Sequence, residues 1–158
     1  MRFHLVLLSF IVAVPALVPA LATALVLPHA ATQAAAAEAT TITLSGVVTT
    51  ADKGNYQERA FEVPAAVTRI DVDFAYDNRG QGTELEVGLF DSQRFRGTSR
   101  FSKDHFHLTE FEATPSYFAG PLPAGTWRLS LGIPSIGAGQ SSKWTATIRL
   151  STRSTPIE

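Results

Sequence analysis

Apolar and polar residues alternate with a period of two through most of the chain beyond residue 40. The clearest case is residues 68–76, where one set of alternate positions is apolar and the other is mostly charged. The apolar set is Ile70, Val72, Phe74 and Tyr76. Successive side chains of a β-strand point to opposite faces, so this pattern predicts a strand with one buried face.

Six further segments show the same alternation or a shorter form of it. They are residues 41–48, 57–63, 84–89, 101–108, 127–133 and 144–150. Trp127 and Trp144 fall on the apolar positions of their segments and are predicted to lie in the core. Runs rich in glycine, proline, aspartate and asparagine separate the segments and favour turns. Seven short strands joined in this way predict an all-β fold, an antiparallel β-sandwich of jelly-roll type.

One turn with its following strand occurs twice in the sequence. A Pro-Ala-Ala turn begins at Pro64 and a Pro-Ala-Gly turn begins at Pro123, 59 positions later, and strands of the same parity follow both. A repeat architecture needs three or more units. The similarity therefore indicates two related corners of one sandwich, with coincidence as the alternative.

The first 37 residues differ in composition from the rest. Residues 5–27, 23 positions in all, contain no charged side chain, and an alanine-rich tract with Ala-x-Ala sites follows at 30–37. This pattern predicts a signal peptide at 1–37, one sandwich domain at 38–158, and export to the periplasm or the exterior. An uncleaved anchor helix is the alternative, because about 20 apolar residues can cross a bilayer. Pro15, Pro19 and the alanine tract favour cleavage.

Charge and cysteine content exclude several classes of function. The chain has 158 residues with 13 basic and 14 acidic side chains, a net charge of −1. Without a basic field we expect no nucleic-acid partner and, once the leader is removed, no membrane surface as partner. The absence of cysteine excludes disulfide scaffolds and thiolate metal sites. No Gly-x-Ser-x-Gly elbow or glycine-rich phosphate loop occurs, so no catalysis is expected from this chain.

His105 and His107 form the first candidate site. Residues i and i+2 of a strand share a face, so both imidazoles could bind one zinc-like ion, with Asp104 or Glu110 completing the site. The alternative is a solvent-facing strand on which Phe106 is buried.

Acidic and amide side chains form a second candidate, for structural calcium, which prefers oxygen ligands. The set is Asp71, Asp73, Asp77, Asn78, Glu84, Glu86 and Asp91. Several of these positions alternate with core positions, so a solvated outer face, partly paired with Arg69, is the alternative.

Three arginines interleaved with phenylalanines form a third candidate. Arg94, Arg96 and Arg100 could bind a carbohydrate or an anion through stacking and bidentate hydrogen bonds. The alternative is a long loop that the neighbouring phenylalanines pack onto the sandwich.

The sequence also resembles a known family. The segments that carry the resemblance are FEVPAAVTRIDVDFAYD at 61–77, LFD at 89–91, FRG at 95–97, ATPSY at 113–117 and GPLPAGTWR at 120–128. Together they resemble the N-terminal domain of bacterial CehA/McbA-type metallohydrolases over about residues 56–132. A looser similarity is to bacterial prepeptidase C-terminal domains.

The resemblance implies a β-sandwich of the kind that precedes a PHP-type phosphoesterase domain. The metal ligands of that family lie in the domain after the sandwich. The first of them form a His-x-His motif at the end of a strand. His105 and His107 lie within the sandwich region and lack the continuation of that motif, so no catalytic site is carried over. We expect an exported, non-catalytic accessory or binding module for a carbohydrate or a protein partner. The alternative is the N-terminal part or subunit of a PHP-type metal-dependent phosphoesterase whose catalytic domain is not in this chain.

Overall fold

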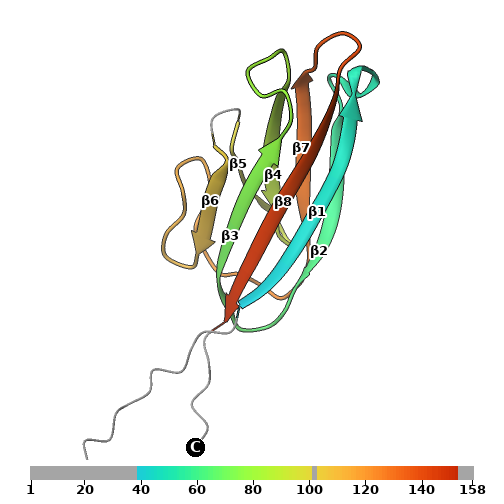
Figure 1. Cartoon of the computed structure of the whole chain (residues 1–158). Coiled ribbons are helices and arrows are strands. Elements are labelled where there is room, and N and C mark those ends of the chain that lie inside the picture. Colours follow the sequence, from blue (N-terminus) through green and yellow to red (C-terminus); the bar gives the residue numbers. More distant parts are fainter. Residues whose placement is uncertain (1–38, 101–102, 153–158) are drawn as a thin grey trace, which may run out of the picture. The chain divides into compact units, whose positions relative to one another are not determined.

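The alternating segments form strands in the computed structural model, which describes residues 39–100 and 103–152 (Figure 1). The predicted leader at 1–37 lies outside the described residues. The strands are β1 (Ala39–Thr49), β2 (Tyr56–Val63), β3 (Val67–Tyr76), β4 (Glu84–Phe90), β5 (Phe95–Thr98), β6 (His105–Thr109), β7 (Gly125–Ser135) and β8 (Ser141–Thr152). A turn of 3-10 helix, η1 (Thr50–Asp52), follows β1. No helix within the two described ranges is long and apolar enough to cross a membrane.

The strands form two four-stranded antiparallel sheets that pack face to face. The first sheet has the order β1-β8-β3-β6 and the second sheet has the order β2-β7-β4-β5. The first strand of the chain pairs with the last, the second with the second last, and so on inward: β1 with β8, β2 with β7, β3 with β6 and β4 with β5. The chain therefore folds as one long hairpin that is wrapped into two layers. This strand order is that of a jelly roll. The predicted all-β antiparallel sandwich is confirmed.

The core lies between the sheets and contains the residues that the alternation predicts. Trp127 and Trp144 are almost fully buried, with exposed fractions of 0% and 1%, and they lie on opposite sheets. Ile70 and Val72 of β3 and Leu129 of β7 are also inaccessible to solvent. Each such aliphatic side chain contributes roughly 1.5–3 kcal/mol through burial.

The repeated turn starts one strand in each sheet. Ala66 and Gly125, at equivalent positions 59 residues apart, both have positive φ, 64° and 123°. β3 begins immediately after Ala66, and β7 begins at Gly125. Each turn therefore leads into a strand through a residue of positive φ, a conformation that glycine adopts without strain.

Two strands differ from the prediction. Residues 95–98 form β5 rather than a loop, because they pair with Gly88, Leu89 and Phe90 of β4. The core-facing position of β5 is Arg96, so the strand lacks the apolar alternation that would identify it. Strand β6 begins at His105; Phe101 lies outside the described residues.

Residues 112–118 close one side of the sandwich. The N–H of Thr114 donates to the carbonyl of His107 on β6, at 3.0 Å, and the N–H of Phe118 donates to the carbonyl of Arg96 on β5, at 2.9 Å. This segment therefore bonds to an edge strand of each sheet.

Candidate binding groove

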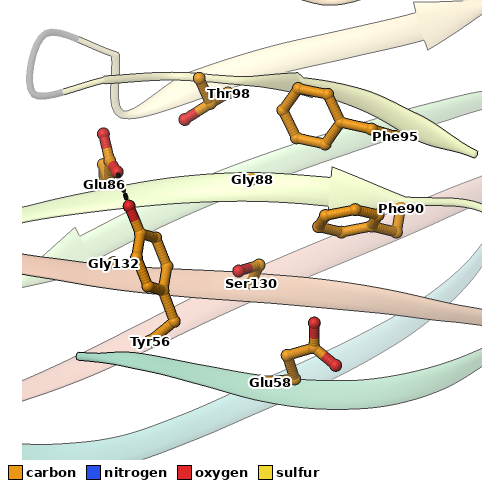
Figure 2. A pocket seen from close by; sticks show the side chains of 9 residues that line it. All are labelled: Tyr56, Glu58, Glu86, Gly88, Phe90, Phe95, Thr98, Ser130 and Gly132. Carbon is orange, nitrogen blue, oxygen red and sulfur yellow. Dashed lines mark hydrogen bonds between the residues drawn. The ribbon is translucent and has the colours of Figure 1, made fainter.

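The outer face of the second sheet carries a groove at its centre (Figure 2). The groove has a volume of about 410 Å³ and is lined by residues of all four strands. They are Tyr56 and Glu58 on β2, Ser130 and Gly132 on β7, Glu86, Gly88 and Phe90 on β4, and Phe95 and Thr98 on β5. Alternate residues of a strand point outward, so most of the groove is built from positions that the core does not use.

Small residues form the floor of the groove. In one row across the sheet, Gly132 is the register partner of Tyr56 on one side and of Glu86 on the other. In the next row Ser130 is the partner of Gly88. Larger side chains stand on either side of this floor, as Figure 2 shows. The hollow follows from having glycine or serine at outward positions of the two central strands.

Tyr56 and Glu86 form the first wall. The phenol Oη of Tyr56 donates to Oε1 of Glu86 across 3.3 Å, so the two side chains meet above Gly132. A Cβ on Gly132 would lie 2.7 Å from Cγ of Glu86 and 2.9 Å from Cε1 of Tyr56. This wall therefore requires glycine beneath it. Tyr56 is 68% exposed, which leaves its ring free to contact a ligand.

Phe90 and Phe95 form the second wall. Their ring centroids are 5.0 Å apart with the planes tilted by 53°. The guanidinium of Arg128 lies over the Phe90 ring, 5.0 Å from its centroid, and donates to Oε2 of Glu58 at 2.9 Å. The wall thus presents an aromatic surface beside a carboxylate that is held in place. Phe90 lies four residues beyond Glu86 on β4, so the two walls rise about 13 Å apart.

A smaller hollow of about 230 Å³ adjoins the first wall. Tyr56 and Glu86 line both spaces, and the smaller hollow is completed by Asn55 and Pro134 among others. The Tyr56–Glu86 pair is therefore accessible from two sides.

Arg96 anchors the base of the second wall. Its side chain is completely buried, and all its contacts are internal. Nη1 donates to Oδ2 of Asp91 at 3.0 Å and to the carbonyl of Pro121 at 2.9 Å, Nη2 donates to the carbonyl of Gly120, and Nε donates to that of Phe118. A guanidinium can be buried only when its donors are satisfied in this way. Arg96 therefore ties the 118–121 loop to β5, which carries Phe95.

Asp91 holds the turn that leads into β5. Its Oδ1 accepts from the N–H groups of Gln93 at 2.7 Å and Arg94 at 2.6 Å, and its Oδ2 accepts from Arg96. Burial acts to raise the pKa of Asp91, but the two backbone hydrogen bonds and the Arg96 guanidinium outweigh it, and the pKa is lowered. The carboxylate is therefore ionised and structural at neutral pH.

The three predicted arginines do not share one surface. Arg96 faces the core. Arg94, whose side chain is 52% exposed, precedes β5 and donates to the carbonyl of Ala119 at 3.4 Å. Arg100 follows β5, is exposed, and has a φ of 47°. The structure thus gives Arg96 a structural role and leaves Arg94 and Arg100 as separate surface residues.

The two histidines lie on edge strand β6, and Phe106 between them is buried. Nδ1 of His105 lies 2.8 Å from Oδ1 of Asp73, and Nε2 of His107 lies 3.5 Å from Oε1 of Glu112. The hydrogen bond from His105 is the main reason why the pKa of Asp73 is lowered. His105 therefore contacts the carboxylates of Asp73 and of Asp71, whose Oδ1 lies 3.8 Å from Nε2, and His107 contacts that of Glu112.

The other two proposed zinc ligands lie elsewhere. Asp104 pairs with Arg79, whose Nη1 is 3.6 Å from its Oδ2, and Glu110 is exposed on the turn after β6. Within residues 39–100 and 103–152, no three histidine or carboxylate groups are placed to hold one metal ion. The structure therefore does not assemble the set formed by His105, His107, Asp104 and Glu110.

The acidic set proposed for calcium is dispersed over both sheets. Asp71 and Asp73 lie on β3 of the first sheet, and Arg69 forms a bidentate pair with Asp71 at 2.7 Å, as the alternative interpretation predicts. Glu84 and Glu86 lie on β4 of the second sheet. The remaining members are Asp77 and Asn78 in the turn after β3 and Asp91 beside Arg96.

The sequence pattern alone does not predict the groove. It places Glu86 among the candidate calcium ligands and gives no binding role to Tyr56, Glu58, Gly88, Ser130 or Gly132. One feature of the sequence is nevertheless consistent with a binding surface on this face. Phe90 and Tyr56 are aromatic residues at outward positions of strands, where polar residues are the rule, and glycine occurs at outward positions of β4 and β7.

A second hollow, of about 490 Å³, lies beside the turn after β6. It is lined by seven residues, namely Val67, Thr68, Thr109, Glu110, Phe111, Glu112 and Leu122. Phe111 is the most exposed large apolar side chain of the described residues, at 88%. This hollow offers one aromatic ring, whereas the groove offers three.

Comparison of the chain with family models and with curated proteins finds no match.

Proposed function

We propose that this chain is an exported binding module that takes carbohydrate in the groove on the outer face of the second sheet. The observation that carries the proposal is the pairing of two walls of aromatic rings with carboxylates across a floor of glycine and serine. A sugar ring has an apolar face of C–H groups and a rim of hydroxyls. The groove offers a complement to each of these.

The aromatic side chains supply the apolar contacts. Tyr56 is 68% exposed and Phe95 is 43% exposed, so both can bury area on a ligand without unfolding of the sheet. Aromatic side chains contribute large contact areas at little entropic cost, because they have few rotatable bonds. Because the rings of Phe90 and Phe95 are tilted against each other, they form a non-planar aromatic surface, which can contact the puckered ring of a sugar.

The carboxylates supply the polar contacts. Glu86 accepts from Tyr56, and Glu58 accepts from Arg128, so both are oriented before a ligand arrives. A carboxylate has about four lone-pair positions, so each retains capacity to accept from sugar hydroxyls. A pocket with a few fixed polar groups among apolar ones is the usual form of a small-molecule site.

The direction of the groove favours a polymer. Its walls stand on either side of the row that contains Gly88 and Ser130, so the open channel crosses the strands rather than following them. It extends from Glu58 on β2 to Thr98 on β5, the two edges of the sheet. A channel that reaches both edges can accept a chain that continues beyond it.

The test is binding of the full chain to a panel of neutral and acidic oligosaccharides and polysaccharides. We expect binding to at least one neutral glycan, with about tenfold or greater weakening by Tyr56→Ala and by Phe95→Ala, because aromatic anchors dominate such sites. Phe111→Ala is the matched control, since it removes an exposed phenylalanine outside the groove. Absence of glycan binding, or equal binding by all three variants, would overturn the proposal.

A further inference from the structure

The jelly roll has four edge strands, and within residues 39–100 and 103–152 only β1 is both uncovered and uncharged. The edges are β1 and β6 in the first sheet and β2 and β5 in the second sheet. Residues 112–118 bond to β6 and β5, as described above. Strand β2 carries Glu58, Arg59 and Glu62, and charges on an edge discourage pairing with another sheet.

Within the part of the chain that the structure describes, strand β1 has none of the features that usually protect a sheet edge, namely charges, prolines, bulges or a covering segment. Its eleven residues include no charged side chain and no proline. Its register with β8 runs through eleven consecutive pairs without a bulge. Among the described residues, the one side-chain hydrogen bond to a β1 backbone group is at its end, where the N–H of Thr49 donates to Oδ2 of Asp52 at 2.7 Å. A long, regular edge of this kind is a template for another strand.

We propose that β1 pairs antiparallel with β1 of a second copy of this chain, across a two-fold axis at Leu44. This register is the one that pairs all eleven residues, because Leu44 is the central residue of Ala39–Thr49. It joins the first sheets of the two copies into one continuous eight-stranded sheet. A two-fold interface requires a surface that is complementary to itself.

The side chains of β1 meet that requirement in this register. On the outer face, Thr43 of one copy lies opposite Ser45 of the other, and Thr41 lies opposite Val47. On the core side, Ile42 lies opposite Gly46, and the two Leu44 side chains meet. No charge faces another charge, and the partly buried Ile42 and Leu44 gain cover. Val47, which is 53% exposed in the single chain, also gains a neighbour.

Charge substitutions test the pairing and its register together. The side chains of Thr43 and Ser45 are exposed, so charged residues at these positions leave the core of the single chain intact. The double variant T43K/S45K places like charges opposite each other twice in the dimer, and like charges across a strand pair are destabilising. The double variant T43K/S45E places opposite charges at the same two contacts.

The measurement is analytical ultracentrifugation of the full chain over a range of concentrations, with thermal melting of each variant as a check on folding. We expect a monomer–dimer equilibrium, an increase of about tenfold or more in the dimer dissociation constant for T43K/S45K, and recovery for T43K/S45E. T145K, which adds a lysine on the outer face of the neighbouring β8, should dimerise as the wild type does. A wild-type monomer at every concentration would overturn the proposal, as would dimerisation of T43K/S45K at wild-type strength or failure of T43K/S45E to recover.

Discussion

The ring of Tyr56 lies across Gly132, its register partner on the neighbouring strand, and a Cβ on that glycine would approach Cε1 of Tyr56 to 2.9 Å. Glu86 approaches the same glycine from the other side and accepts from Tyr56 Oη. The contact joins strands that are not neighbours, since β7 separates β2 from β4. The first wall of the groove therefore depends on the absence of a side chain at one position.

Gly132→Ala tests this dependence. The added methyl group should displace the side chains of Tyr56 and Glu86, which stand on the outer face of the sheet and can rotate away, so the free energy of unfolding should change by less than about 1 kcal/mol. Glycan binding should fall about tenfold, because the wall no longer presents the same surface. Thermal melting and a binding isotherm measure the two effects. Gly88→Ala is the control for the free energy of unfolding alone, because Gly88 itself lies on the floor of the groove; its Cβ would meet neighbours only at 3.5 Å or beyond and should leave the Tyr56–Glu86 contact intact.

Arg96→Met should be among the most damaging substitutions outside the apolar core. It leaves the buried carboxylate of Asp91 with its two backbone donors and the exposed Arg94 alone, and it removes the donors to three carbonyls of the 118–121 loop. We expect a loss of about 3–5 kcal/mol in the free energy of unfolding, measured by chemical denaturation.

Arg94→Ala is the matched control for Arg96→Met. Its side chain is 52% exposed and lies 3.8 Å from the same Asp91 carboxylate. An exposed pair of this kind contributes less than about 1 kcal/mol. Equal losses for the two variants would contradict the role given to Arg96.

The stability of the fold should decrease in acid through Asp91 and Asp73. Both pKa values are lowered in the folded state, Asp73 chiefly by its hydrogen bond from His105, and Asp91 by hydrogen bonds that outweigh burial. A lowered folded-state pKa gives a contribution that is fully present above the unfolded value of about 3.9 and is lost as the pH falls through the folded value. The free energy of unfolding should therefore decline below about pH 4.

Asp91→Asn should make the free energy of unfolding less dependent on pH in this acidic range. The variant has no carboxylate to protonate at this position, so its stability, although lower at pH 7, should fall less between pH 5 and pH 2 than that of the wild type. Denaturant titrations at a series of pH values give both curves. Parallel curves would show that Asp91 does not contribute to the acid dependence.

Leu129→Asp should abolish cooperative folding. Leu129 is completely buried at the centre of β7. An unpaired carboxylate at this position should reduce the free energy of unfolding by more than about 4 kcal/mol. Circular dichroism during heating is the measurement, and Thr145→Asp, at an exposed position of β8, is the control. A normal melting transition for Leu129→Asp would contradict the assignment of strand faces.

The alternation of apolar and polar residues predicts most strands, because it indicates which face of the sheet each side chain occupies. Trp127 and Leu129 follow the rule and are buried in β7. Strand β5 could not be found in this way, since its core-facing residue is Arg96, whose charge is satisfied by Asp91 and by loop carbonyls. These partners are distant in sequence or lie outside regular strands, so no local pattern indicates them.

The groove could not be predicted because it depends on strand order. Tyr56 and Glu86 are 30 residues apart, and they meet because β7, from much later in the chain, lies between their strands. The sequence does indicate which faces are outward. It does not indicate which outward residues lie side by side until the register of β2, β7 and β4 is known.

An NMR titration of the full chain with an oligosaccharide that binds it is the most direct test of whether the groove on the second sheet is a carbohydrate site. We expect saturable shifts of the Tyr56, Phe90 and Phe95 ring signals and of the Gly88 and Gly132 amides, while the signals of Phe111 stay unchanged. Saturable shifts confined to residues outside the groove, with these five residues unaffected, would contradict this assignment.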